Sequence, residues 1–242
     1  MSQLGNPARD EDALRAFLAR VLGYERTQAV EHALRSIDLA ATHRAALVLL
    51  GDADADLGSV ARALHCRAVG ADRPFVICGR KRGTATAAAQ TAHGGSLLVR
   101  RRRLPGDFRA AVELVRDPTA AVQLIVCSDA RHDAHPFVAL PVPIVVPSIR
   151  ERAHEVPRII DEYAGDAVRT LRDAWFSDLD REWVIRHAAG SLSEIETATL
   201  RRTALRVAGS IEAAAKLLGL TGVGMRQWLH RRKHARRGGM RP

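Results

Sequence analysis

Residues 45–50 read AALVLL, an uninterrupted apolar run whose length suits a β-strand that is buried on both faces. Further runs of the same kind follow at 74–78 (PFVIC), 96–99 (SLLV), 122–127 (VQLIVC) and 142–146 (VPIVV). Helical segments alternate with these runs, notably at 59–69 and 107–115. Continuous apolar strands that alternate with helices are typical of a parallel sheet covered by helices on both faces. The sequence therefore predicts an α/β fold for this part of the chain.

The net charge of +10 is concentrated at the C-terminal end. Residues 200–242 contain eleven lysines and arginines and a single acid, Glu212, whereas the remaining 199 residues balance 26 basic against 26 acidic side chains. A neutral body with a basic end is typical of a nucleic-acid-binding module attached to a separate domain. A solvated basic tail without a structured target is the alternative interpretation.

The sequence pattern at this basic end favours the structured alternative. Residues 194–207 and 211–218 place apolar side chains at helical spacing, and Gly209 and Ser210 separate the two segments, with Ser210 as a candidate N-cap. Thr221 can cap a final helix, in which the apolar residues are Val223, Met225, Trp228 and Leu229. Short helices joined by a glycine-containing turn predict a helix-turn-helix, whose second helix enters the DNA major groove.

The same segment resembles the Fis-type helix-turn-helix. The family pattern A-L, then G-N, then A-A-x-x-L-G-I corresponds here to Ala204-Leu205, Gly209-Ser210, Ala214-Ala215 and Leu218-Gly219-Leu220, over about 35 residues. The resemblance implies binding to double-stranded DNA and, because the terminal helices of such modules pair, a homodimer. The chain departs from the family at Gly222 and Gly224, where recognition helices usually carry polar or charged side chains. Sequence specificity is therefore expected to be weak.

Candidate DNA contacts lie along the final helix and at its start. The guanidinium, amide and imidazole groups of Arg226, Gln227 and His230 suit base edges, and those of Arg231, Arg232 and Lys233 suit phosphates. The predicted DNA-binding residues are Thr221, Arg226, Gln227, His230, Arg231, Arg232 and Lys233.

Several segments upstream, taken in order, resemble the central AAA+ domain of the NtrC-like, sigma-54-dependent enhancer-binding proteins. The family's first strand and phosphate loop, V-L-I-x-G-E-S-G-T-G-K-E-x-x-A-R-A-I-H, corresponds to residues 47–65, LVLLGDADADLGSVARALH. Further matches are PFVIC at 74–78, GGSLLVRR at 94–101, VQLIVCSD at 122–129 and VPSIRERAHEVP at 146–157. The resemblance spans about residues 25–235 and implies an AAA+-like core with a small helical lid.

We therefore expect five parts in the chain. They are an N-terminal helical extension (1–24), a degenerate AAA+-like α/β domain (25–146), a helical lid-like region (147–190), a Fis-type helix-turn-helix (191–235) and a basic tail (236–242). Because fewer than 30 residues precede the core, no N-terminal receiver or sensor domain is expected.

The residues that an AAA+ domain needs for ATP hydrolysis are replaced in this chain. A phosphate loop requires glycines that let backbone N–H groups approach the phosphates, and a lysine that reaches them. Leu57 stands at the lysine position, and Asp54 and Asp56 stand at the glycine positions. Arg100 and Arg101 replace the two acids that would hold Mg²⁺, which inverts the required charge.

The sensor arginine of the family corresponds to Ser193, and residues 80–93 are too short to carry the loop that contacts sigma-54. The predicted degenerate nucleotide site consists of Gly51, Asp54, Asp56, Leu57, Arg100, Arg101 and Ser193. We expect no ATPase activity, no sigma-54 remodelling and no cofactor.

Other charged clusters leave weaker alternatives. The run DADAD at 52–56 resembles the start of a calcium loop but lacks the glycine and glutamate that complete one. His132 and His135 have metal-ligand spacing, but a loop is favoured there, so no metal site is predicted. The arginine clusters at 80–82 and 100–103 either bind an anion or a DNA phosphate, or form solvated turns paired with nearby acids.

The sequence contains no apolar stretch of membrane-spanning length, and its N-terminus is polar, so neither a membrane span nor a signal peptide is expected. Cys66, Cys78 and Cys127 are odd in number and far apart, which favours reduced thiols and a cytoplasmic protein. Two functions remain open: a DNA-binding transcriptional regulator, or a non-catalytic protein that associates with active AAA+ regulators and modulates them.

Overall fold

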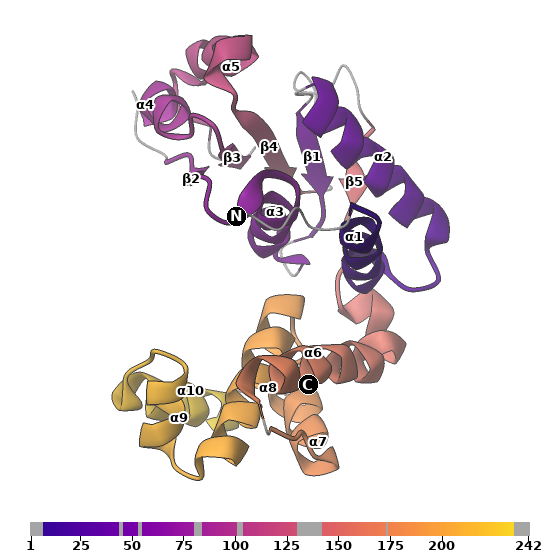
Figure 1. Ribbon diagram of the computed structural model, residues 1–242, viewed down its shortest axis with the longest axis vertical. Coiled ribbons are helices and arrows are strands. Elements are labelled where there is room, and N and C mark those ends of the chain that lie inside the picture. Colours follow the sequence, from indigo (N-terminus) through magenta and orange to yellow (C-terminus); the bar gives the residue numbers. More distant parts are fainter. Residues whose placement is uncertain are drawn as a thin grey trace, which may run out of the picture. The chain divides into compact units, whose positions relative to one another are not determined.

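The computed structural model describes residues 7–43, 46–52, 55–79, 84–100, 104–129, 142–172 and 174–234, with the side chains of 7–10, 118, 233 and 234 left aside. The chain divides into two compact units, Met1–Ser148 and Ile149–Pro242 (Figure 1). The unit boundary lies two residues after the expected end of the α/β domain. The second unit contains both the expected lid-like region and the expected helix-turn-helix.

The first unit is built on a five-stranded sheet. Its strands are β1 (Leu47–Leu50), β2 (Phe75–Ile77), β3 (Ser96–Arg100), β4 (Gln123–Ser128) and β5 (Ile144–Val145), in the spatial order β2-β3-β4-β1-β5. Every strand pair is parallel, with Leu98 opposite Ile125 and Leu49 opposite Cys127. Each strand coincides with one of the predicted apolar runs, so the predicted α/β fold class is confirmed.

Helices cover both faces of this sheet, as predicted. They are α1 (Pro7–Leu22), α2 (Thr27–His43), α3 (Leu57–His65), which continues as a π-helix over Cys66–Gly70, α4 (Thr84–Thr91) and α5 (Phe108–Arg116). Because successive side chains of a strand point to opposite faces, Val48, Leu97 and Val126 pack with α4 and α5. The helices α2 and α3 contact the sheet from the other side (Figure 1).

The helix α4 is not predicted from the apolar pattern, because threonine and alanine fill it. One carboxylate oxygen of Asp107 holds its first turn, accepting hydrogen bonds from the backbone N–H groups of Ala85 (3.1 Å) and Thr86 (3.0 Å) and from the Thr86 hydroxyl (2.8 Å). The backbone hydrogen bond from Thr86 is the largest influence on this carboxyl and, with the other bonds, lowers the pKa of Asp107 to about 2.

The secondary structure of the second unit consists of helices alone within its described residues. It comprises a 3₁₀ segment (Arg150–Glu155) followed by α6 (Val156–Leu171), α7 (Asp178–His187), α8 (Leu192–Ala208), α9 (Ile211–Leu217) and α10 (Gly222–His234). Within the region expected to be lid-like, the α-helix begins only at Val156, because Arg152 has φ −124° and ψ 32° and interrupts the helical segment before it. Pro157 explains the break, because proline fits the first turn of a helix but not its interior. The core of the unit forms where α6 packs on α8, around Ile159, Ile160 and Ile195.

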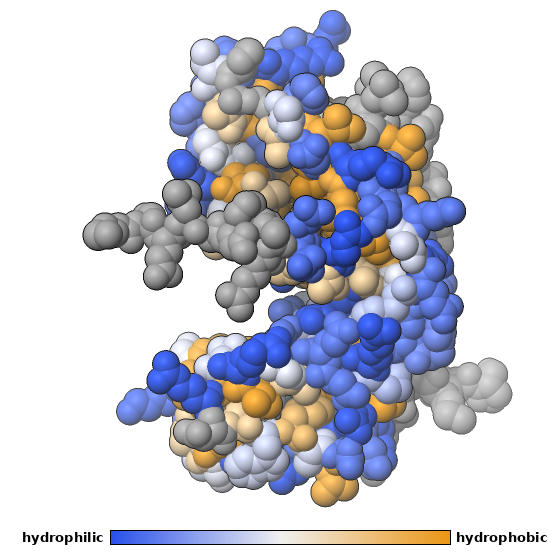
Figure 2. All heavy atoms as spheres, turned by 45° about the vertical axis from the view of Figure 1, so that its right-hand side comes forward, coloured by the Kyte–Doolittle hydropathy of each residue, from blue (hydrophilic) through white to orange (hydrophobic). Residues whose placement is uncertain are grey.

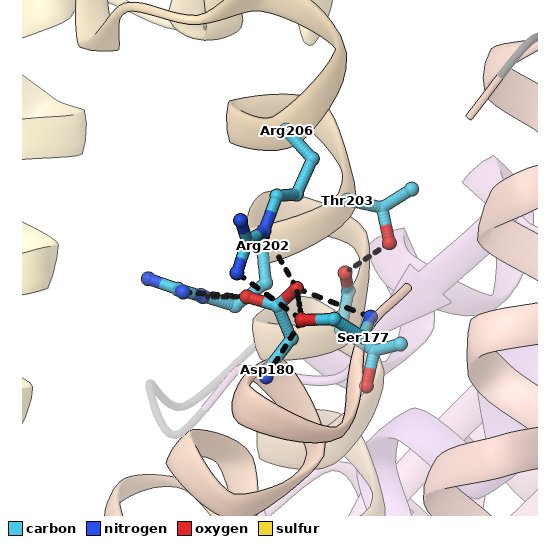
Figure 3. Close-up of polar contacts among 6 residues, drawn as sticks. Ser177, Asp180, Arg202, Thr203 and Arg206 are labelled. Atoms are coloured by element: carbon cyan, nitrogen blue, oxygen red, sulfur yellow. Dashed lines mark hydrogen bonds and ion pairs between the residues drawn. The ribbon is translucent and has the colours of Figure 1, made fainter. Parts of the chain in front are cut away.

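A buried carboxylate joins α7 to α8 (Figure 3). Asp180 has no exposed surface and accepts hydrogen bonds from the Ser177 hydroxyl (2.7 Å), Arg202 Nε (2.8 Å) and Arg206 Nε (2.8 Å). With Ser177 it also forms the capping box that begins α7. Burial alone would raise the pKa of Asp180, but the hydrogen bonds from Ser177, Arg206 and Arg202 outweigh burial and lower it.

Candidate nucleic-acid interface

The last two helices are each begun by a hydroxyl cap. The Ser210 hydroxyl accepts the Ala213 N–H at 3.2 Å at the start of α9, and the Thr221 hydroxyl accepts the Gly224 N–H at 3.1 Å at the start of α10. Gly219 lies between the two helices with φ +65°, a left-handed conformation that favours glycine. These short-range features produce the turn that the sequence predicts.

Small side chains let α9 and α10 approach each other. Ala214 and Ala215 are buried on α9, and Met225 and Trp228 are buried on α10. The helix α9 also contacts α8, so the three terminal helices form one packed module (Figure 1). Within this module, α9 and α10 are two short helices joined by a tight turn, and α10 is the second of the two.

The opposite side of α10 is exposed and carries most of the predicted DNA contacts. Arg226, Gln227, His230 and Arg231 together line an open depression on this surface. Val223 lies one turn before Gln227 and is 57% exposed. We call Val223, Arg226, Gln227, His230 and Arg231 the outer face of α10. Hydrophilic and hydrophobic side chains lie beside one another over the surface of the second unit (Figure 2).

An ion pair connects α9 to the outer face. Glu212, the single acid in residues 200–242, pairs with Arg226 through Oε1 and Nη1. The pair passes over Gly222, where an added Cβ would lie 3.7 Å from Glu212 Cγ and 3.8 Å from Arg226 Nη2. Both side chains remain more than half exposed, so the pair lies at the surface, where another anion can compete for the guanidinium.

Two of the other predicted contacts, Arg232 and Thr221, have partners within the second unit. Arg232 Nη2 pairs with Glu194 Oε1 at 2.8 Å, and the Arg232 carbonyl accepts a hydrogen bond from His187 Nδ1 at 3.1 Å, so this arginine ties α10 to α8 and α7. Thr221 is engaged as the helix cap. The side chain of Lys233 lies outside the described residues.

A second cation on the module is not among the predicted contacts. The Arg201 guanidinium stacks over the Trp228 ring at 4.7 Å, and Trp228 lies 5.6 Å from Trp183 of α7. Burial, followed by the charges of Arg231 and Arg232, lowers the pKa of Arg201. No local signal in the sequence identifies this stack, because its three side chains come from three helices.

Gly51, at the start of the segment expected to resemble a phosphate loop, is closely surrounded by atoms of its own unit. Asp56 adopts φ 47° and ψ 51°, the left-handed conformation that glycine adopts most readily. A Cβ added to Gly51 would lie 2.7 Å from the Val146 carbonyl oxygen, 2.8 Å from Ala55 Cβ and 3.0 Å from Leu57 Cδ2. Leu57 and the buried Ala55 therefore occupy the space directly above Gly51.

The carboxyl end of β3 carries a positive charge in this region. Arg100 is the last residue of β3, and its Nη2 atom lies 3.2 Å from where a Cβ on Gly58 would be, beside the first turn of α3. Gly51, Asp56, Leu57 and Arg100 are thus brought together at one edge of the sheet. Asp54 and Arg101 lie outside the described residues, as do 80–82 and 101–103. Ser193 lies in the first turn of α8, in the other unit.

Cys127 is a buried free thiol at this edge. Burial, partly opposed by the charge of Arg100, raises the pKa of Cys127 to about 12, so the thiolate is suppressed. Within the described ranges, no group of three histidine, cysteine, aspartate or glutamate side chains could hold a metal ion. His132 and His135 lie outside those ranges. No described helix combines the length and apolar character needed to cross a membrane.

No protein-family model matches this chain, and no curated protein sequence does. Three solved structures of NtrX from Brucella abortus are similar to it. One is 13% identical with a TM-score of 0.41 and covers 84% of this chain and 67% of that one. The ADP complex is 15% identical with a TM-score of 0.45, and the match covers 93% of this chain and 72% of that one. The ATP complex is 14% identical with a TM-score of 0.47, and the match covers 93% of this chain and 73% of that one. At these values the likeness assigns neither a family nor an activity to the chain.

Proposed function

We propose that this chain is a regulator that binds duplex DNA through the outer face of α10 and does not hydrolyse ATP. The observation that carries the proposal is that the segment with the whole net charge of +10 is also the segment that forms the capped pair of helices resembling a helix-turn-helix. Basic side chains that surround a second helix of this kind match the phosphates on either side of the major groove.

The contacts divide by chemistry. Arg226 and Gln227 reach outward from the middle of α10 and can each form two parallel hydrogen bonds, to guanine and adenine respectively. Arg231 lies one turn further along and suits a phosphate. We assign Arg232 a structural role, because Glu194 already binds its guanidinium. A homodimer, which the Fis-type resemblance implies, would place two such helices on one duplex.

The α/β unit is proposed to act as a scaffold. Leu57 cannot supply the charge of a phosphate-loop lysine, and its side chain packs close to Gly51 beside Ala55. Arg100 stands where a Mg²⁺-binding acid would be required. Calorimetric titration with Mg²⁺–ATP should therefore give no saturable heat, and saturable binding with hydrolysis would overturn this part of the proposal.

Fluorescence anisotropy on a 25-bp duplex, repeated at several salt concentrations, tests DNA binding. We expect the slope of log Kd against log salt to fall by about one for Arg231→Ala, which removes a phosphate contact, and Arg226→Ala to cost about 1–3 kcal/mol of binding, because it removes a base contact. Arg116→Ala is the matched control, since this arginine is 71% exposed but lies on α5 of the other unit. Failure of the wild-type chain to bind any duplex at 50–100 mM salt would overturn the proposed function.

A further inference from the structure

Val223 is an exposed apolar residue at the start of α10. It is the second residue of the helix, is 57% exposed and lies between two glycines, Gly222 and Gly224. Because both neighbours lack side chains, the valine methyl groups protrude from the first turn. A β-branched residue in an exposed helical position contributes less to helix stability than alanine, so helix formation does not explain its presence.

The spacing along α10 places Val223 on the DNA-facing side. Residues 223, 227 and 230 follow the i, i+4, i+7 pattern, which aligns them along one face of a helix. Gln227 and His230 line the exposed depression, whereas Met225 and Trp228 are buried on the opposite side. Val223 is therefore the apolar end of a row that is otherwise polar.

The surroundings of Val223 decide what kind of partner can cover it. Arg226 and Arg231 share the outer face, and the segment 200–242 carries a charge of +10, so a polyanion is favoured over an apolar protein surface. Among polyanions, duplex DNA presents one apolar group in its major groove, the C5 methyl of thymine.

We propose that Val223 contacts the C5 methyl group of thymine and gives the module a preference for A·T base pairs at the position read by the first turn of α10. This inference rests on the proposed function and adds to it the chemistry that the helix reads. The two glycines assist by letting the first turn approach the bases closely, while Arg226 reads the neighbouring pair.

Uracil-substituted DNA isolates the contribution of the thymine methyl group to binding. The full chain is titrated by anisotropy with a 30-bp duplex of mixed A·T sequence, and with the same duplex in which uracil replaces every thymine. Burial of a group of this size changes affinity about fourfold, so we expect the uracil duplex to bind about fourfold more weakly. Val223→Ala should remove this difference while leaving the salt slope unchanged.

Val207→Ala is the matched control, because Val207 is 37% exposed on α8 and should leave the thymine preference intact. Equal binding of the two duplexes by the wild-type chain would overturn the inference and leave the proposed function standing. A thymine preference that survives in Val223→Ala would overturn it as well, by tracing the preference to DNA shape. Failure to bind either duplex would overturn the proposed function itself.

Discussion

Replacing Asp180 with asparagine removes the negative charge through which α7 binds two arginines of α8. The carboxylate is fully buried and accepts hydrogen bonds from Ser177, Arg202 and Arg206. Removing one partner of a buried ion pair costs about 3–5 kcal/mol, because the remaining charge is left without compensation. Arg202 and Arg206 keep 22% and 34% of their side chains exposed, so water replaces part of the lost interaction. We therefore expect the free energy of unfolding to fall by about 2–3 kcal/mol.

The distribution of tryptophan gives a selective assay. Trp175, Trp183 and Trp228 are the three tryptophans of the chain, and all belong to the second unit. Urea unfolding followed by tryptophan fluorescence therefore reports on this unit alone. Asp178→Asn is the control, since Asp178 is 88% exposed and its pair with Arg181 at the surface should contribute less than about 1 kcal/mol.

The same contact predicts a dependence on pH. Because the pKa of Asp180 is lowered on folding, its stabilisation is fully present above the ordinary aspartate pKa of about 4 and is lost as the pH falls below it. The wild-type unit should lose stability in that range, and Asp180→Asn should lose less. If Asp180→Asn unfolds at the same urea concentration as Asp178→Asn, the carboxylate does not hold the two helices together.

Changes at three other places should also be measurable. Glu212→Gln frees Arg226 from its ion pair, so the anisotropy titration should show roughly three- to tenfold tighter duplex binding at 50 mM salt. Gly222→Ala should raise the urea midpoint of the second unit, because alanine favours the helix and the added Cβ comes no closer than 3.7 Å to side-chain atoms. Gly224→Ala should raise the midpoint less, because its added Cβ would lie 3.0 Å from the capping hydroxyl of Thr221. Asp107→Asn should lower the thermal midpoint of the α/β unit and reduce its decline between about pH 4 and 2, where the wild-type carboxyl becomes protonated. An unchanged midpoint or affinity would contradict the contact concerned.

The strands are predictable from the sequence because a strand buried on both faces must be apolar throughout. β1 and β4 lie within one or two residues of the predicted runs. The helix α4 is not predictable in this way, since its alanines and threonines carry little periodic signal, and the Asp107 carboxylate that caps it lies more than 20 residues away.

Part of the candidate interface is also predictable from the sequence. The Ser210 and Thr221 caps depend on neighbours three residues away, and both are present where the sequence predicts them. The pairing of Arg232 with Glu194 and the stacking of Arg201 on Trp228 depend on how α8 and α10 pack together. A count of charges in the sequence therefore treats both arginines as available to DNA.

The filled loop at Gly51 has a thermodynamic consequence. A loop that closes around a ligand gains stability as the ligand concentration rises, by RT ln(1 + [L]/Kd). Here Ala55 and Leu57 pack beside Gly51 and belong to the chain itself, so their contribution to stability does not vary with the concentration of a ligand. On the proposed function, the stability of the α/β unit is therefore independent of the nucleotide concentration around it.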